Sequence, residues 1–180
     1  FNQNNQENLS FVFKICEKLK ISKKVIIKTI NKFQGLNYRQ QVIYNSKKLS
    51  IINDSKSTSF SSTINLINSY NNIFWILGGL PKKNDKLNFR KNKYTKIQAY
   101  IFGKSANFFI KKLRNKMDFQ VFNSLKQAFK KTLIDIKNLN IYTKKIILFS
   151  PSSASFDEYK NFEQRGAYFN FLVKSIKYKL

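Results

Sequence analysis

Residues 53–58 of the 180-residue chain, Asn-Asp-Ser-Lys-Ser-Thr, combine a carboxylate, an amine and several hydroxyls in one short segment. The segment follows an apolar stretch and precedes a helical pattern, so we predict a strand-to-helix turn. There Lys56 can supply positive charge and Thr58 a hydroxyl donor to a metal-bound nucleotide or another anion. The alternative is an ordinary helix N-cap, in which Asp54 or Ser55 accepts backbone N–H bonds, and the residues alone leave both interpretations open.

A second candidate segment is the Gly78-Gly79 pair and the lysine that follows it, Lys82. Two glycines allow the backbone to approach a ligand closely, and Lys82 can bind a carboxylate or a phosphate. The Gly-x-x-x-x-Gly-Lys-Ser/Thr spacing of a P-loop is absent from the sequence. On spacing alone, a tight turn with a solvent-exposed lysine is the favoured interpretation.

A third segment, residues 150–157, is rich in small and hydroxyl side chains and follows another apolar stretch. Its Ser155 can donate a hydrogen bond to a carboxylate, whereas the alternative is a pair of helix caps with Asp157 and Glu163 in first helical turns. The sequence has no histidine and one cysteine, Cys16. The composition therefore argues against a serine hydrolase, a histidine-based triad and a zinc site, and no internal disulfide can form.

Asn5 and Asn8 are three residues apart and share one face of a predicted amino-terminal helix. Their side-chain amides can donate to and accept from the edge of an adenine ring. The alternative for both residues is a simple helix cap.

The charge of the chain is strongly positive: 34 lysines and arginines stand against 9 acidic residues, a formal net charge of +25. Such a charge is typical of proteins that bind nucleic acid or an anionic membrane. Only four of these basic residues are arginine, although phosphate and base recognition favour its forked guanidinium. The lysines are spread among many Asn, Ile and Phe residues, so we attribute them to an A- and T-rich coding sequence. Nucleic acid is not the partner that we expect.

Length and composition predict a globular chain, because domains average roughly 150 residues and 42% of this chain is hydrophobic. The longest apolar run, residues 73–77, is far below the ~20 residues needed to cross a bilayer. From its opening residues we also expect no secretory leader. We therefore expect a cytoplasmic protein without a membrane span.

Apolar spacing predicts a helical hairpin over residues 8–20 and 22–33, with Gly35 as its stop. The pattern changes after it, so we divide the chain into residues 1–34 and residues 35–180. In the second part we predict strands at 38–44, 49–52, 73–77, 97–102, 119–122 and 145–149. We also predict one helix that ends near Tyr70 and three more at 105–115, 124–139 and 162–178.

Apolar strands that alternate with helices predict an α/β fold with a mostly parallel sheet and helices on both faces. Ligands of such sheets bind beyond the carboxyl ends of the strands, where chain turns and helix starts meet. The three candidate segments all follow predicted strands. We therefore expect them to form one site.

Read in order, these segments resemble motifs of the Mur ligase family. Residues 5–8 are similar to its Asn-x-x-Asn motif, residues 35–39 to its Gly-Leu-x-x-Arg motif, and residues 53–58 to its Asn-Asp-Ser-Lys-Ala-Thr motif. Residues 76–79 and 150–166 resemble the D-glutamate-adding branch and not its siblings that add other amino acids. The resemblance implies a Rossmann-like carboxyl-terminal Mur ligase domain, preceded by a helical hairpin from the end of the central ATP-binding domain.

The resemblance also implies an activity, an ATP-driven amide ligation of peptidoglycan synthesis. ATP phosphorylates the alanyl carboxylate of UDP-N-acetylmuramoyl-L-alanine, and the amine of D-glutamate attacks the acyl phosphate. By matched position it assigns ATP contacts to Asn5, Asn8, Arg39 and Asp54, a catalytic role near the reacting phosphates to Lys56, and D-glutamate contacts to Thr58, Lys82, Ser155 and Phe162. The resemblance also implies Mg²⁺ as a cofactor, and we expect its ligands in the part of the enzyme that is missing here.

Two features depart from the family pattern. Asn4 stands where the family usually has a histidine, which bears on the contact with adenine. The family's N-terminal nucleotide-sugar domain, its P-loop and its magnesium ligands have no counterpart here. We therefore expect a fragment or truncated reading frame that needs the missing N-terminal and central domains and does not turn over alone. The rival hypothesis, from another class, is a basic nucleic-acid-binding module.

Overall fold

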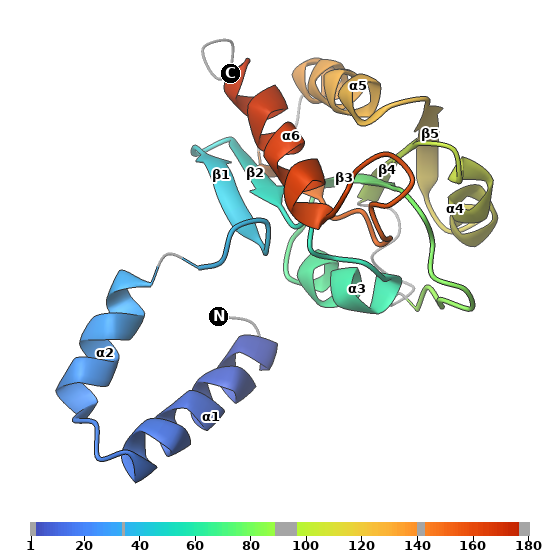
Figure 1. The fold of residues 1–180 in the computed structure, drawn as a ribbon. Coiled ribbons are helices and arrows are strands. Elements are labelled where there is room, and N and C mark those ends of the chain that lie inside the picture. The colour runs from blue at the N-terminus through green and yellow to red at the C-terminus, as the bar shows by residue number, and fades with distance from the viewer. Residues whose placement is uncertain (1–2, 34, 89–96, 140–142, 177–180) are drawn as a thin grey trace. The chain divides into compact units, whose positions relative to one another are not determined.

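The computed structural model describes residues 3–33, 35–88, 97–139 and 143–176. The chain forms two compact units, Phe1–Gly35 and Leu36–Leu180 (Figure 1). The first unit consists of α1 (Gln3–Lys18) and α2 (Lys23–Lys32), so both predicted helices exist and the first begins five residues earlier than expected. Ser22 occupies the N-cap position of α2, but its side chain makes no capping hydrogen bond.

The second unit is built on one six-stranded sheet. Its strands are β1 (Gln41–Asn45), β2 (Leu49–Asn53), β3 (Ile73–Gly78), β4 (Ile97–Phe102), β5 (Asp118–Phe122) and β6 (Lys145–Phe149). The strand order is β1-β2-β6-β3-β4-β5, with β1 antiparallel to β2 and every other neighbouring pair parallel. The predicted α/β fold with a mostly parallel sheet is confirmed.

Helices cover both faces of this sheet (Figure 1). They are α3 (Phe60–Asn68), α4 (Ala106–Leu113), α5 (Leu125–Asn138) and α6 (Phe162–Lys174). Ile52, Trp75 and Leu148 pack in the core formed with α3 and α4, whereas their neighbours along the strands pack with α5 and α6. Because the inner strands are buried on both faces, they lack polar alternation and read as continuous apolar runs.

The first strand is shorter than predicted, since β1 begins at Gln41 and not at Tyr38. Tyr38 and Gln40 have positive φ angles of 60° and 50°, which a strand cannot accommodate. The ring of Tyr38 lies against Gly166 in α6, where a Cβ would overlap it. This turn is therefore fixed by packing against a distant helix, which spacing along the sequence does not reveal.

Helix α3 begins with a capping box. The side chain of Ser59 accepts a hydrogen bond from the backbone N–H of Ser62, and the side chain of Ser62 accepts one from Ser59. The alternative interpretation in which Asp54 or Ser55 caps this helix is wrong, because those residues lie too far before its first turn.

We expect the Ser59→Ala substitution to lower the free energy of unfolding of the second unit by about 1 kcal/mol, the usual value of such a cap. The single tryptophan, Trp75, is buried in β3, so urea unfolding followed by its fluorescence reports on this unit. Asn65→Ala on the exposed side of the same helix is the control, and we expect no loss there. Equal stability of the Ser59 variant and the unsubstituted chain would contradict this prediction.

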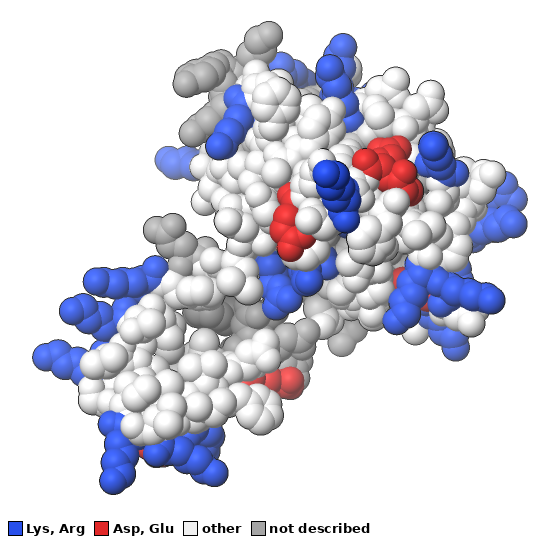
Figure 2. Space-filling model, viewed as in Figure 1, with Lys and Arg blue, Asp and Glu red and all other residues white. Residues whose placement is uncertain are grey.

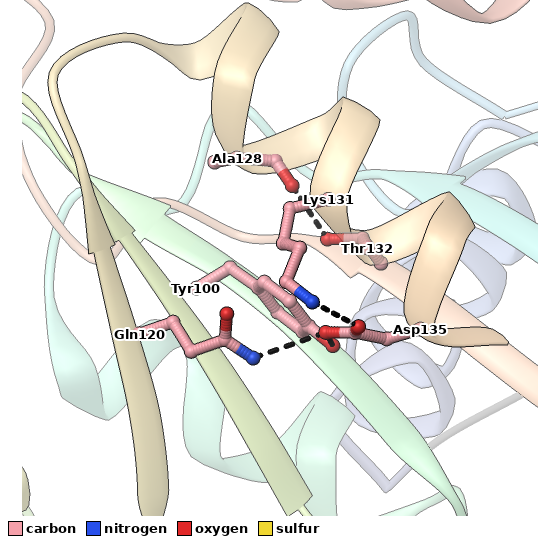
Figure 3. Close-up of polar contacts among 6 residues, drawn as sticks. All are labelled: Tyr100, Gln120, Ala128, Lys131, Thr132 and Asp135. Carbon is pink, nitrogen blue, oxygen red and sulfur yellow. Dashed lines mark hydrogen bonds and ion pairs between the residues drawn. The ribbon is translucent and has the colours of Figure 1, made fainter. Parts of the chain in front are cut away.

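A polar cluster joins α5 to the sheet (Figure 3). Tyr100 of β4 donates a hydrogen bond of 2.9 Å to Asp135, Gln120 of β5 donates one of 3.0 Å, and Lys131 completes an ion pair at 2.5 Å. Burial acts to raise the pKa of Asp135, but these donors outweigh it, so the pKa lies below its ordinary value. The cluster holds the carboxyl-terminal half of α5 against β4 and the edge strand β5.

Figure 2 shows basic side chains scattered over both units, with no single area in which they gather on this face. Within the described part of the chain, no helix is long and apolar enough to span a membrane.

Candidate functional site

Three chain segments meet at the carboxyl ends of β2, β6 and β3, which are neighbours in the sheet. The backbone N–H of Asp54 donates to Phe149 O at 2.7 Å, which joins the end of β2 to the end of β6. Leu80 and Ala154 exchange two hydrogen bonds of 2.9 Å, which joins the segment after β3 to the segment after β6. The three candidate segments of the sequence therefore lie together at one edge of the sheet.

The buried carboxylate of Asp54 faces the protein interior. Its Oδ2 accepts a hydrogen bond of 2.9 Å from Ser150 Oγ, and its Oδ1 accepts one of 3.1 Å from the backbone N–H of Gln40. Burial raises the pKa of Asp54 to about 6, against the opposing effects of these two donors and of nearby Arg39. Asp54 thus fixes the exposed turn that carries Arg39 to the end of the sheet.

A chain of buried hydroxyls continues from Asp54 toward α3. Ser150 Oγ lies 2.9 Å from Thr63 Oγ1, which also contacts Ser152 Oγ and Ser57 Oγ, each at 2.6 Å. Each of these four side chains is at most 3% exposed. Because these four hydroxyls are paired with one another inside the protein, they link the segments internally and are not presented to a ligand.

Lys56 and Phe162, two of the predicted site residues, are brought together. The Nζ of Lys56 lies 4.0 Å from the centre of the Phe162 ring, a cation–π contact. Phe162 is the first residue of α6, and its carbonyl accepts a hydrogen bond of 2.9 Å from Ser55 Oγ. The Lys56 side chain is exposed, so its ammonium stays available to an anion while the ring restricts its position.

Thr58, Lys82 and Ser155 lie on the connected segments. Thr58 and Lys82 are exposed, and their segments are joined where Phe60 N donates to Asp85 Oδ2 at 2.6 Å. Ser155 is buried, at 2% exposed, and directly follows Ala154, whose backbone pairs with Leu80. The structure therefore links the three segments that carry the expected D-glutamate contacts.

The expected ATP contacts are divided between the two units. Asn5 and Asn8 lie on α1 of the first unit, and Arg39 and Asp54 lie in the second. The side chain of Asn8 is exposed, and that of Asn5 lies outside the described part of the structure.

Arg165 is the main site residue that the sequence interpretation missed. It is 0% exposed, and its guanidinium donates hydrogen bonds to Ser55 Oγ at 3.1 Å, to the carbonyls of Ser55 and Ser153 at 2.9 Å each, and to the carbonyl of Ala154 at 3.1 Å. A signal existed, because Arg165 shares a helical face with Phe162, Phe169 and Leu172. That spacing predicts an inward-facing arginine.

The described residues offer no metal centre. No three of their acidic and cysteine side chains are grouped so that they could hold a metal ion. The described residues therefore offer no ready-made carboxylate cluster for Mg²⁺, and we route no chemical step through a metal here.

Known proteins match the chain over nearly its whole length. It is 34% identical to the UDP-N-acetylmuramoylalanine–D-glutamate ligase of Rickettsia felis over 180 residues, which is 97% of this chain and 40% of that protein. It is also 34% identical to the protein of the same name from Wolbachia pipientis, and 33% identical to that of Francisella tularensis, with 34% and 43% of those proteins covered. The resemblance to the Mur ligase family is confirmed. No protein-family model matches the chain.

The matched stretch is the carboxyl-terminal part of these Mur ligases. The chain spans less than half the length of each of the three relatives. The observed fold, a mostly parallel sheet with helices on both faces, is consistent with a Rossmann-like Mur ligase carboxyl-terminal domain.

Proposed function

We propose that this chain supplies the D-glutamate site of an ATP-dependent Mur ligase, which joins D-glutamate to UDP-N-acetylmuramoyl-L-alanine in cytoplasmic peptidoglycan synthesis. One observation carries the proposal. In a chain 34% identical to D-glutamate-adding ligases, the segments with Lys56, Lys82 and Ser155 meet at the carboxyl edge of one sheet. Ligands of parallel α/β sheets bind at this edge.

The chemistry of the edge suits a small dicarboxylate. The ammonium group of Lys82 compensates a carboxylate charge, and the hydroxyls of Thr58 and Ser155 donate hydrogen bonds to carboxylate oxygens. Lys56 keeps its proposed catalytic role near the reacting phosphates. Phe162 restricts the position of Lys56 through the ring contact. These residues bind and orient the amino acid so that its amine can attack an acyl phosphate, and positioning of this kind is a large part of the catalysis of such a step.

ATP supplies the phosphoryl group that activates the alanyl carboxylate. Arg39 is exposed and can bind a phosphate, whereas both oxygens of Asp54 are occupied by hydrogen bonds within the protein. We therefore assign the phosphate contact to Arg39 and give Asp54 the role of holding its turn through Gln40. Mg²⁺ is assigned to the part of the ligase that this chain does not match.

The first unit is proposed to be the helical end of the central ATP-binding domain, with Asn5 and Asn8 reading the adenine edge. The exposure of its apolar side chains supports this assignment, because a solvated hairpin would not favour so many of them. These side chains are Phe11, Val12, Ile15, Leu19, Val25, Ile27 and Phe33, each at least 47% exposed.

A chimeric enzyme tests the proposed function. The full 180-residue chain replaces the matched stretch of the Rickettsia felis ligase, and product formation from ATP, D-glutamate and UDP-N-acetylmuramoyl-L-alanine is measured. We expect product with D-glutamate and none with L-glutamate, and no product from the 180-residue chain alone. A folded chimera that forms no product, beside an active R. felis enzyme, would overturn the proposal.

Lys82→Ala in this chimera is expected to raise the KM for D-glutamate at least tenfold and to change kcat much less, because one charge partner of the bound dicarboxylate is lost. The neighbouring Lys83→Ala is the matched control, since both lysines are exposed on the same segment. We expect the KM of the Lys83→Ala variant for D-glutamate to stay within twofold of that of the unsubstituted chimera. Equal KM values for the two variants would remove Lys82 from the site.

The rival hypothesis, a basic nucleic-acid-binding module, is separated by a binding experiment. Oligonucleotide affinity that falls by about a thousandfold between roughly 50 and 200 mM salt would favour it, since a protein that contacts many phosphates behaves in this way. On the face shown in Figure 2 the basic side chains are scattered and do not form a dedicated binding surface.

A further inference from the structure

One buried cation, Arg165, bonds directly to two of the three segments of the carboxyl edge and shares an acceptor with the third. The Arg165 side chain bonds to Ser55, which directly precedes Lys56, and to Ala154, which directly precedes Ser155. The carbonyl of Ala154 also accepts the N–H of Leu80, two residues before Lys82. The guanidinium therefore binds the segments that carry Lys56 and Ser155 directly, and it is linked to the Lys82 segment through the carbonyl of Ala154.

The type of this residue is informative. A buried charge costs free energy, and apolar residues of similar volume often pack at such positions without loss of stability. The four acceptors of Arg165 are neutral oxygens, and Asp157 stabilises the charge at longer range. Burial lowers the pKa of Arg165 to about 10, so the group stays charged at neutral pH. A residue that only fills space needs neither a charge nor several donors. The rigid, planar guanidinium of Arg165, by contrast, fixes the positions of several oxygens at once.

We propose that Arg165 is a positioning residue for D-glutamate, which sets the spacing between Lys56 and Thr58 on one segment and Ser155 on another. It acts through Ser55, Ser153 and Ala154 and does not itself touch the amino acid. This inference rests on the proposed function, and it adds a residue whose loss should affect one substrate selectively.

Hydrogen–deuterium exchange on the full 180-residue chain tests the structural half of this proposal. Arg165→Met keeps the volume but removes the fork, and Arg165→Lys keeps the charge with a single donor group. We expect both to speed exchange in residues 53–58 and residues 150–156 together, while β4 and β5 keep their protection. Faster exchange in one segment alone would overturn the coupling.

Steady-state kinetics of the chimera test the functional half. We expect both Arg165 variants to raise the KM for D-glutamate at least tenfold, with kcat and the KM for ATP within threefold of the unsubstituted chimera. Ser55→Ala removes one acceptor of the guanidinium and should shift the same constant in the same direction by a smaller factor, and it serves if the Arg165 variants do not fold. Leu113→Ala, a fully buried position on α4, controls for simple loss of stability.

The outcomes separate the two proposals. An unsubstituted chimera that forms no product overturns the proposed function and this role with it. With an active chimera, an unchanged KM for D-glutamate in Arg165→Lys, or a rise no larger than that of Leu113→Ala, overturns the positioning role alone.

Discussion

The Gly79→Ala variant is expected to lose about 4 kcal/mol of stability in the second unit, from a strained backbone angle and a steric overlap together. Gly79 has a φ angle of +125°. A Cβ built there would lie 2.5 Å from the carbonyl oxygen of Ala154, 2.6 Å from Ser153 Oγ and 2.9 Å from Arg165 Nη1. Two of these atoms belong to the segment after β6, which hydrogen bonds hold in place. Relief of the overlap must therefore separate the segments after β3 and β6.

Gly103→Ala is the matched control for this variant. Gly103 also has a positive φ, +87°, but an added Cβ would find its nearest neighbour at an ordinary 3.5 Å. We expect it to cost only about 1–2 kcal/mol, the strain part of the effect. Urea unfolding followed by Trp75 fluorescence measures both. If the two variants lose the same stability, the close approach at Gly79 is not what requires a glycine there.

Asp54→Asn is expected to stabilise the second unit at neutral pH. The pKa of Asp54 is raised from 3.8 to about 6 in the folded chain, so the folded state holds this proton more tightly than the unfolded state. The unsubstituted chain therefore loses stability as the pH rises from about 4 to about 6, by about 3 kcal/mol for a shift of this size. The neutral amide avoids that loss, and it can still accept from Gln40 N–H and donate to Ser150 Oγ.

The measurement is the difference in unfolding free energy between Asp54→Asn and the unsubstituted chain across this pH range. We expect it to be near zero below pH 4 and to reach its full value of about 3 kcal/mol above pH 6. Asp118→Asn, at an exposed position at the start of β5, is the control, and we expect no gain in stability from it at neutral pH. A stability difference for Asp54→Asn that does not vary with pH would show that burial of its charge is not the cause.

Local sequence patterns predicted most of the helices and strands of this protein, because the spacing of apolar residues reflects which side chains are buried. The strands β4 and β6 were predicted with the bounds that they have, 97–102 and 145–149, since each is an apolar run buried on both faces. The order of the strands was not predictable in this way. Nothing in the residues of β6 says that it lies between β2 and β3, because that position is set by contacts with strands far away in the sequence.

The site shows the same division. The sequence located the segments with Lys56, Lys82 and Ser155, because each segment follows a predicted strand and their motifs occur in the family's order. The turn at Tyr38, the internal bonds of Asp54 and the contacts of Arg165 depend on partners that include residues more than a hundred positions away along the chain. Contacts of that range leave no spacing signal. Of these features, only the inward-facing position of Arg165 on α6 could be predicted, because it follows from helical periodicity.

The insertion of β6 between β2 and β3 has a consequence for how the molecule assembles. Two strands made early in synthesis have no mutual pairing and must wait for a third, which leaves the ribosome about seventy residues after β3. Until then their hydrogen-bonding edges stay open to water or to other chains, and contacts of such long range slow folding. The edge that gathers the lysines and serines therefore cannot form until β6 is in place between β2 and β3.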